Sequence, residues 1–321
     1  MNIRLLVCSA VLASAGAWLV SRFAYRLGLL DIPNDRSSHS LPTPRGGGIG
    51  ILLSFIIASF ASGTSLLLWL PIVFVALVSL FDDKLNLTFR IRLLFQFGAA
   101  LVILFVLLTP LPINPLLKFL LLVCLSVFIA GTANFFNFMD GINGIAGLTG
   151  TVGFVLLALF ARKQGYDTQA LVLLAVSCAC LGFLPFNFPA ARVFMGDVGS
   201  VLLGFLYAVS VVALARNPLE FLALAACLST FYVDALTTLF IRWRSGERLT
   251  QAHRRHLYQL LANQMHLPHW QVSLGYAVIQ ALVGIASLRL ASSGAVQFTL
   301  FLFAAFFAWC YFMQRIRRAV E

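Results

Sequence analysis

Long apolar runs are the feature of this 321-residue sequence that most limits how it can fold. Eleven such runs follow one another with short connections, and most approach the roughly 20 residues that a helix needs to cross a bilayer. Helices satisfy their own backbone groups in hydrocarbon, and no strand-like alternation indicates a barrel. The sequence therefore predicts an all-α polytopic membrane protein in which residues 1–321 form one transmembrane domain. The predicted spans are 3–20, 49–62, 65–80, 93–108, 116–136, 142–161, 170–186, 201–215, 219–240, 272–290 and 295–312.

Composition supports this class, because 61% of the residues are hydrophobic and only 10% are charged, far from the values of soluble domains. Residues 3–20 imitate a cleavable secretory signal, but we expect a retained helix since the apolar run continues through Trp18 and Val20. The net charge of +11 is spread over loop ends without a basic block. This pattern favours anionic membrane lipid over nucleic acid as a partner.

The distribution of charge predicts the orientation of the spans. If 49–62 and 65–80 are two spans, most Lys and Arg residues lie on the same side as Asp82, as the positive-inside rule requires. One helix through both runs would be about 50 Å long, against a hydrocarbon core of roughly 30 Å. We therefore expect the N-terminus outside and the C-terminus in the cytoplasm. The loops expected to form the cytoplasmic active face are 22–48, 81–92, 134–141, 187–200 and 241–271.

Four aspartates emerge on that face, namely Asp82, Asp83, Asp140 and Asp197. One such residue is commonly a solvated loop acid or a helix cap, but four at one face, in a chain with only 11 acidic residues, form a candidate site. Clustered carboxylates repel one another unless a cation lies among them, and hard oxygen ligands suit Mg²⁺ or Mn²⁺. Glycines beside Asp140 and Asp197 leave room for a ligand near the backbone. The pattern predicts a divalent cation with bound phosphate or nucleotide.

Two histidines mark a further candidate site. His253 and His256 would share one face of a helix, with Arg255 alongside. Zinc binding is one interpretation, but histidine with arginine also forms a cationic site for phosphate. We favour contact with phosphate or pyrophosphate, and an amphipathic surface helix is the alternative.

Asp234, inside the ninth run, has either a functional or a hydrogen-bonded structural role. The glycine run 46–50 lacks the strand and the Lys-Ser/Thr pair of a phosphate-binding loop.

Five separated motifs carry a resemblance to a known family. They are the segment 31–36 with His39 and residues 42–48, the pair Asp82 and Asp83 followed by Arg90 and Arg92, the segment 137–144, the segment 194–200, and His253 with His256. Together they resemble the polyprenyl-phosphate N-acetylhexosamine-1-phosphate transferases, and the likeness extends from the first cytoplasmic loop to the loop after the ninth run.

The resemblance implies a phosphoglycosyltransferase of the bacterial cytoplasmic membrane that uses Mg²⁺ or Mn²⁺. It would move an N-acetylaminosugar-1-phosphate from a UDP-sugar to undecaprenyl phosphate and release UMP. Catalysis is then expected from Asp82, Asp83 and Asp197, and metal binding from Asp197, Asp82 and Asp140. The residues expected to bind substrate are Arg45, Arg90, Arg92, Asn137, Asp140, Asn143, Phe194, His253, Arg255 and His256.

Two positions distinguish branches of the family. Asn143 stands where the peptidoglycan branch, which acts on UDP-N-acetylmuramoyl-pentapeptide, typically carries aspartate, and Arg255 stands where many relatives have a middle histidine. The segment 253–259 looks most like the branch that initiates O-antigen synthesis for lipopolysaccharide. The resemblance therefore implies a UDP-N-acetylaminosugar donor, without selecting one sugar.

Two alternatives concern the mechanism and the class. Direct attack by the lipid phosphate is favoured over a phosphoryl intermediate on Asp82 or Asp83, because a phosphate monoester is already largely dianionic at pH 7. A transporter or flippase of lipid-linked or anionic solutes is the alternative class, but its charges would lie near the midplane of the membrane rather than at one face. Pairing into a homodimer is left open by the sequence.

Overall fold

The computed structural model describes residues 2–33, 38, 41–85, 87–249 and 253–320. Residues 34–37 and His39 of the first-loop motif therefore lie outside the described residues, as does the side chain of Asp83. The first helices are α1 (Ile3–Leu27), α2 (Ile49–Ala61), α3 (Leu66–Leu85), α4 (Phe89–Leu108), α5 (Pro115–Phe138), α6 (Ile145–Lys163) and α7 (Asp167–Asn187). They are followed by α8 (Asp197–Leu214), α9 (Pro218–Ala226), α10 (Ser229–Arg244), α11 (Leu257–Gln259), the π-helical turn η1 (Leu260–Gln264), α12 (His269–Ser293) and α13 (Ala295–Val320).

The described chain is predominantly helical, which confirms the all-α class. Eight helices are long and apolar enough to cross a membrane, namely α1, α4, α5, α6, α7, α8, α12 and α13, and a ninth span results if α9 and α10 count as one. The shorter apolar helices α2 and α3 coincide with two more predicted runs. Eleven spans and their orientation stay predictions.

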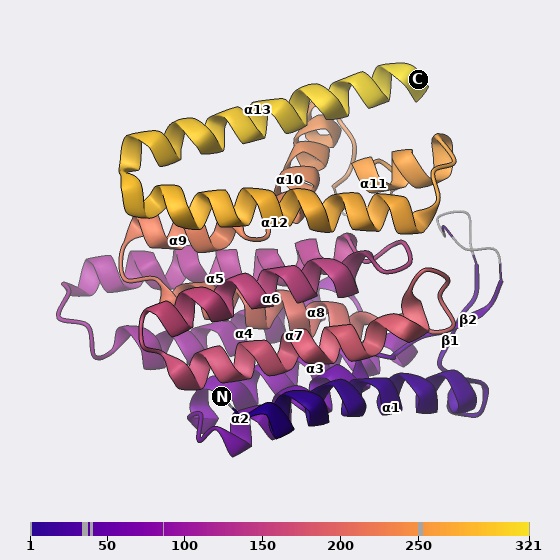
Figure 1. Ribbon diagram of the computed structural model, residues 1–321, viewed down its shortest axis with the longest axis horizontal. Helices are drawn as coiled ribbons and strands as arrows, with labels where there is room; N and C mark the ends of the chain where they lie inside the picture. Colours follow the sequence, from indigo (N-terminus) through magenta and orange to yellow (C-terminus); the bar gives the residue numbers. More distant parts are fainter. Residues whose placement is uncertain (1, 34–37, 39–40, 86, 250–252, 321) are drawn as a thin grey trace.

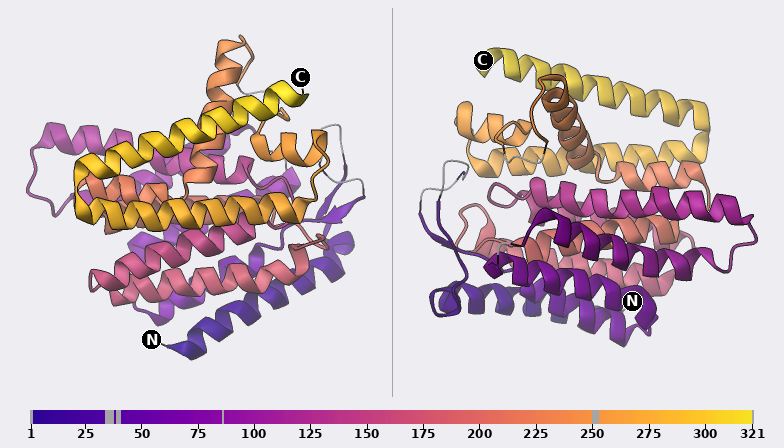
Figure 2. Two further views of the ribbon diagram at one scale, coloured as in Figure 1. Left: turned by 45° about the horizontal axis from the view of Figure 1, so that its top comes forward. Right: turned by 180° about the vertical axis from the view of Figure 1, so that it is seen from behind.

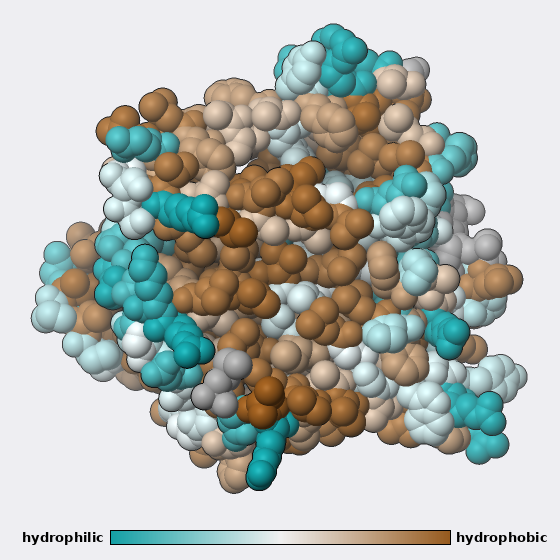
Figure 3. All heavy atoms as spheres, viewed as in Figure 1, coloured by the Kyte–Doolittle hydropathy of each residue, from teal (hydrophilic) through white to brown (hydrophobic). Residues whose placement is uncertain are grey.

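The long helices lie side by side, with α1 and α13 at opposite edges and the β1–β2 hairpin at one end of the bundle (Figure 1). Hydrophobic residues cover the middle of the face seen in Figure 3, and hydrophilic residues gather toward two of its edges, as expected of a bilayer-spanning bundle. Most of α8 is buried, between α5 and α3. The N-terminal end of α8 is therefore held rigidly by its neighbours.

Close backbone contact fixes the first loop against the start of α8. Gly48 and Gly199 pack so tightly that a Cβ atom on Gly48 would clash with the backbone of Gly199. The amides of Gly47 and Gly48 each donate a hydrogen bond, to the carbonyl oxygens of Phe194 and Met195, both at 2.9 Å. The glycine run is thus a packing element that lets two backbone segments approach, as small residues do between membrane helices.

The ninth predicted run, residues 219–240, is not one continuous helix. The chain bends by 88° between α9 and α10, and Figure 2 shows α10 crossing the direction of the neighbouring helices. Polar side chains on α10, among them Asp234, Thr238 and Arg242, are buried, and buried polar groups need hydrogen-bond partners. Their partners lie in the segment after α10 and on α12, so the bend accompanies these contacts.

Two further expectations need correction. Residues 253–256 are not helical, because the helix begins only at Leu257, so His253 and His256 do not share a helix face. Their rings nevertheless lie 4.8 Å apart, centroid to centroid. Parts of the expected loops 22–48 and 81–92 are helical, since α1 continues to Leu27, α3 to Leu85, and α4 begins at Phe89.

We predict that Gly48→Ala weakens the docking of the first loop on α8. The added methyl group meets backbone atoms, which cannot rotate away, so the free energy of unfolding should fall by about 1–3 kcal/mol, as for other overpacked sites. Gly98→Ala in α4 is the matched control, because open space surrounds that position. Thermal unfolding of the purified protein measures the difference, and equal stability of the two variants would contradict the packing role.

Candidate active site

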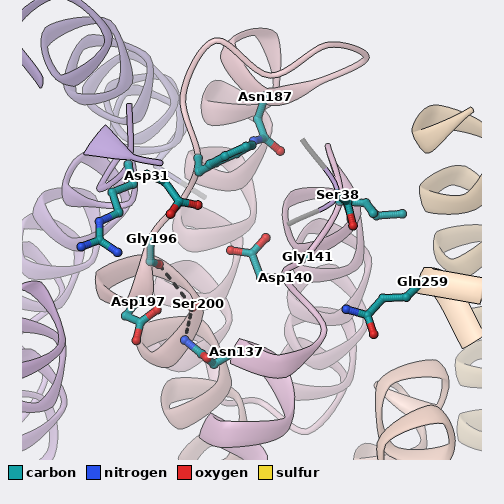
Figure 4. A pocket seen from close by; sticks show the side chains of 13 residues that line it. Asp31, Ser38, Asn137, Asp140, Gly141, Asn187, Gly196, Asp197, Ser200 and Gln259 are labelled. Carbon is teal, nitrogen blue, oxygen red and sulfur yellow. Dashed lines mark hydrogen bonds between the residues drawn. The ribbon is translucent and has the colours of Figure 1, made fainter. Parts of the chain in front are cut away.

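A polar cavity of about 200 Å³ opens at the end of the bundle that carries the β1–β2 hairpin. Its lining residues are Asp31, Ser38, Arg45, Asn137, Asp140, Gly141, Ile142, Asn187, Phe194, Gly196, Asp197, Ser200 and Gln259. Figure 4 shows Asp31, Asp140 and Asp197 approaching this space from different segments. Carboxylates, amides and a guanidinium thus face one small volume, which is the chemistry of a site for a polar ligand.

The first loop supplies Arg45 to this cavity. Strands β1 (Leu30–Asp31) and β2 (Thr43–Pro44) form an antiparallel pair, and Arg45 continues into a parallel bridge with Phe194. The amide of Phe194 donates to the carbonyl oxygen of Pro44 at 2.7 Å. Two predicted site residues far apart in the sequence are therefore held side by side by backbone hydrogen bonds.

The amide side chains of the cavity are also fixed. Asn137, near the C-terminal end of α5, donates to the hydroxyl oxygen of Ser200 at 3.0 Å (Figure 4). Asn187, at the end of α7, accepts from the amide of Gly144 at 2.7 Å and donates to the carbonyl oxygen of Val193 at 2.9 Å. Asn187 therefore braces two loops of the cavity at once.

Arg92 joins two acidic residues of different helices. Its Nη1 atom donates to Oδ2 of Asp82 at 3.0 Å and to Oδ2 of Asp197 at 3.4 Å. Asp82 is buried, and its other oxygen accepts from the amide of Leu87 at 2.6 Å. The Nε atom of Arg92 is buried and has no hydrogen-bond partner among the described residues. A donor in this position is suited to an incoming anion.

An apolar groove of about 550 Å³ lies beside Arg92. It is lined by Phe89, Arg92, Leu93, Phe97, Val127, Ala130, Gly131, Asn134, Phe138, Leu239, Arg242, Leu249, His253, His256 and Gln259. The walls from α4 and α5 are largely hydrocarbon, whereas the histidines and arginines provide a polar end. Gln259 lines both the groove and the polar cavity, so the two spaces adjoin.

The histidine segment has two different environments. His253 is partly buried, and this burial, reinforced by the neighbouring His256 and Arg242 side chains, lowers its pKa to about 4. His256 is buried and lies 3.2 Å from Oδ1 of Asp234 through its Nδ1 atom. Burial also raises the pKa of Tyr258, which donates as a neutral phenol to the carbonyl oxygen of Phe138 at 3.0 Å.

Three predicted substrate-binding residues lie outside both spaces. Arg90 packs over the ring of Phe89, with 5.8 Å from Cζ to the centroid. Arg255 pairs with Glu247 at 2.5 Å. The side chain of Asn143 donates to the carbonyl oxygen of Pro189 at 3.4 Å and does not line the cavity. A motif fixes the position of a residue in the chain but not the direction of its side chain.

The other predicted residues divide between the two spaces. Those that line the polar cavity are Arg45, Asn137, Asp140, Phe194 and Asp197. Those that line the groove are Arg92, His253 and His256, and Asp82 is linked to them through Arg92. Asp31, Asn187, Ser200 and Gln259 were not predicted to bind substrate, although Asp31, Ser200 and Gln259 lie in or beside the motifs.

The expected three-aspartate metal site is not formed in this structure. Among the described residues, no three His, Cys, Asp or Glu side chains are grouped so that they could hold one ion. Asp82 is turned toward Arg92 and the Leu87 amide, whereas Asp140 and Asp197 line one cavity. Mg²⁺ commonly takes one or two carboxylates and completes its shell with water and phosphate oxygens. The donor set of Asp140 and Asp197 fits that smaller requirement.

The fold and the site define a polytopic membrane protein in which a polar cavity adjoins an apolar groove. The sequence profile of glycosyl transferase family 4 matches residues 65–215. A decaprenyl-phosphate N-acetylglucosaminephosphotransferase of Mycolicibacterium smegmatis is 30% identical over 87% of this chain and 78% of its own length. The chain therefore belongs to glycosyl transferase family 4 and is a membrane transferase.

Other relatives carry related names. The decaprenyl-phosphate N-acetylglucosaminephosphotransferase of Mycobacterium tuberculosis is 28% identical over 85% of this chain and 78% of its own length. A probable undecaprenyl-phosphate N-acetylglucosaminyl 1-phosphate transferase of Bacillus subtilis is 30% identical over 61% and 58%. A phospho-N-acetylmuramoyl-pentapeptide-transferase of Nostoc is 35% identical over 38% and 33%. The resemblance inferred from the motifs is thereby confirmed at the level of the family.

We predict that Arg92→Ala destabilises the protein. It leaves the buried carboxylate of Asp82 without its cation, so the free energy of unfolding should fall by about 1–3 kcal/mol. The neighbouring Arg90→Ala should change it by less than about 0.5 kcal/mol, because Arg90 is exposed. Thermal unfolding in detergent compares the two variants, and a loss in Arg90→Ala as large as in Arg92→Ala would contradict this assignment.

The lowered pKa of His253 predicts an acid-dependent loss of stability. Between pH 6.5 and about 4 the unfolded chain binds a proton that folded His253 does not, so stability should fall as the pH decreases through this range. His253→Gln should reduce this dependence, whereas His266→Asn, at an exposed site, should retain it. Unfolding temperatures measured across the range test the difference; identical slopes for His253→Gln and the unaltered protein would refute it.

Proposed function

We propose that the protein transfers an N-acetylaminosugar-1-phosphate from a UDP-sugar to a polyprenyl phosphate and releases UMP. The observation that carries this proposal is the meeting of a polar cavity and an apolar groove at Arg92, which contacts Asp197 of the cavity while lining the groove. A water-soluble donor and a lipid acceptor need such adjoining sites. The names of the relatives, which combine a polyprenyl phosphate with N-acetylglucosamine phosphate, support the same pair of substrates.

The UDP-sugar occupies the polar cavity in this proposal. Arg45 offsets the negative charge of the diphosphate. Asn137 and Phe194 lie where the uridine and the sugar would bind. We infer an N-acetylaminosugar such as N-acetylglucosamine as the transferred group. The histidine segment supports a role in initiating an O-antigen-type lipopolysaccharide glycan, with the cavity facing the cytoplasm at the bacterial inner membrane.

The polyprenyl chain occupies the apolar groove. Phe89, Leu93 and Phe97 on α4 face Val127 on α5, and burial of hydrocarbon against such walls is favourable. The phosphate end then lies near Arg92 and the histidines at the polar end of the groove. Undecaprenyl phosphate is the acceptor that we infer for a bacterial membrane.

The reaction is a direct displacement. An oxygen of the lipid phosphate attacks the sugar-bound phosphorus of the UDP-sugar, the bond from that phosphorus to the bridging oxygen breaks, and UMP leaves with the bond electrons. The largely dianionic lipid phosphate needs no base at pH 7. Arg92 offsets the negative charge that the two phosphates bring together. Both carboxylate oxygens of Asp82 already accept hydrogen bonds, which disfavours Asp82 as a covalent nucleophile.

A divalent cation completes this proposal. Asp197 with Asp140 would hold Mg²⁺ or Mn²⁺, which when bound supplies Lewis-acid neutralisation of the diphosphate. Asp197 is the first residue of α8 and lies in the cavity beside Arg45. Most of α8 is buried, so the helix fixes the position of this carboxylate.

Removal of the Asp197 charge tests the function. In nanodiscs with UDP-N-acetylglucosamine, polyprenyl phosphate and Mg²⁺, Asp197→Asn should lower the rate of UMP release at least about 100-fold, as when one electrostatic contact of a reacting group is lost. Asp167→Asn is the matched control, since Asp167 is also the first residue of a helix but lies at the far end of α7 from the cavity.

The same assay has outcomes that reject the proposal. Unchanged turnover in Asp197→Asn would remove that residue from the site. Failure of the unaltered protein to release UMP from any UDP-N-acetylaminosugar would reject the transferase reaction with these substrates.

A further inference from the structure

Asp234 is a fully buried carboxylate held by five hydrogen-bond donors. These are Nδ1 of His256 at 3.2 Å, the amides of Leu257 at 3.0 Å and Tyr258 at 3.4 Å, Oη of Tyr276 at 2.6 Å and Oγ1 of Thr238 at 3.2 Å. The donors come from α10, the histidine segment with α11, and α12. One side chain thus ties three separate parts of the chain together.

A buried carboxylate is costly unless its charge and lone pairs are satisfied. Among the described residues that contact Asp234, His256 is the one that can carry a positive charge, since the other four donors are neutral groups. The cost of burying this carboxylate is therefore offset by five donors, and one of them is a histidine ring that lines the groove. This pairing separates Asp234 from an ordinary structural acid.

The contact with Asp234 determines which nitrogen of the His256 ring is left to contact a ligand. With Nδ1 directed at the carboxylate, Nε2 is the nitrogen that remains to contact a ligand, and His256 lines the apolar groove. The amides of Leu257 and Tyr258 are the first two of α11, so the same carboxylate also anchors the backbone that carries the ring. Ring orientation and backbone position are fixed together.

A second contact holds the segment from its other side. Nη2 of Arg317, near the end of α13, donates to the carbonyl oxygen of Arg255 at 2.6 Å. The residue before His256 is therefore tied to α13, and the residues after it are tied to α10. The segment has little freedom to turn the imidazole away from the groove.

We propose that Asp234 is a positioning residue that fixes His256 so that Nε2 meets the phosphate of the lipid acceptor at the polar end of the groove. This inference rests on the proposed function. The hydrogen of the Nε2–phosphate contact is supplied by the imidazolium ring or by a singly protonated phosphate. Asp234 itself touches neither substrate, and its effect on turnover passes entirely through His256.

A double-mutant cycle separates this role from a purely structural one. Asp234→Asn should lower kcat of UMP release roughly 10- to 100-fold, which is the size of loss when the carboxylate behind a metal-bound histidine is removed. In a His256→Ala background the same substitution should cost less than about twofold, because coupled residues do not contribute additively. An equal loss in both backgrounds would overturn the proposal.

Tyr276→Phe is the comparison variant. It removes the shortest bond to Asp234 but leaves the contact with His256 in place. Its unfolding temperature should decrease, while its kcat should fall far less than that of Asp234→Asn.

If Asp234→Asn is not recovered folded, Thr238→Val serves instead, because it removes a donor from the Oδ1 atom that holds His256. The loss of kcat caused by Thr238→Val should likewise disappear in the His256→Ala background. Persistence of that loss would overturn the proposal.

Hydrogen exchange tests the anchor without any assumption about the reaction. The amides of Leu257 and Tyr258 should exchange slowly in the unaltered protein and faster in Asp234→Asn. Absence of UMP release with intact protection would reject the proposed function while leaving the anchor supported. Unchanged exchange in Asp234→Asn would reject the positioning role itself.

Discussion

The guanidinium of Arg92 is the contact on which the rest of the site depends. It joins Asp82 of α3 to Asp197 of α8, and it stands where the polar cavity and the apolar groove adjoin. Without a cation here, two carboxylates from different helices would face each other near the end of the bundle, which electrostatics disfavours. The same positive charge is available to phosphates approaching from either space. Helix assembly and substrate recognition are thereby linked through one side chain.

Tight backbone packing fixes the positions of the segments around Arg92. The glycine contact between Gly48 and Gly199 brings the first loop against α8, and the Arg45–Phe194 bridge extends it to the cavity. On the opposite side, Asp234 and Tyr258 hold the histidine segment to α10 and α5. The site is therefore formed by loops that are each held to a helix by hydrogen bonds or close packing, which suits chemistry based on positioning and charge neutralisation.

Sequence reasoning located most of the helices, and it named five of the residues that line the polar cavity, because apolar runs and polar motifs can be read from local composition. Apolar runs predict membrane helices directly, and Asp140 and Asp197 beside glycine lie in the cavity as expected. The bend after Ala226 was not predictable, because hydropathy does not reveal that polar residues of α10 find partners on α12 and in the following segment. The directions of Asn143 and Arg255 depend on Pro189 and Glu247, and pairings of this kind are set by tertiary contacts.

The most direct test is a structure of the protein in nanodiscs with a UDP-N-acetylaminosugar and a polyprenyl phosphate bound together. The account predicts the donor diphosphate in the cavity with Asp197, the lipid chain in the groove between α4 and α5, and the two sets of phosphates meeting at Arg92. A lipid phosphate bound away from Arg92, or a donor outside the polar cavity, would contradict the central claim.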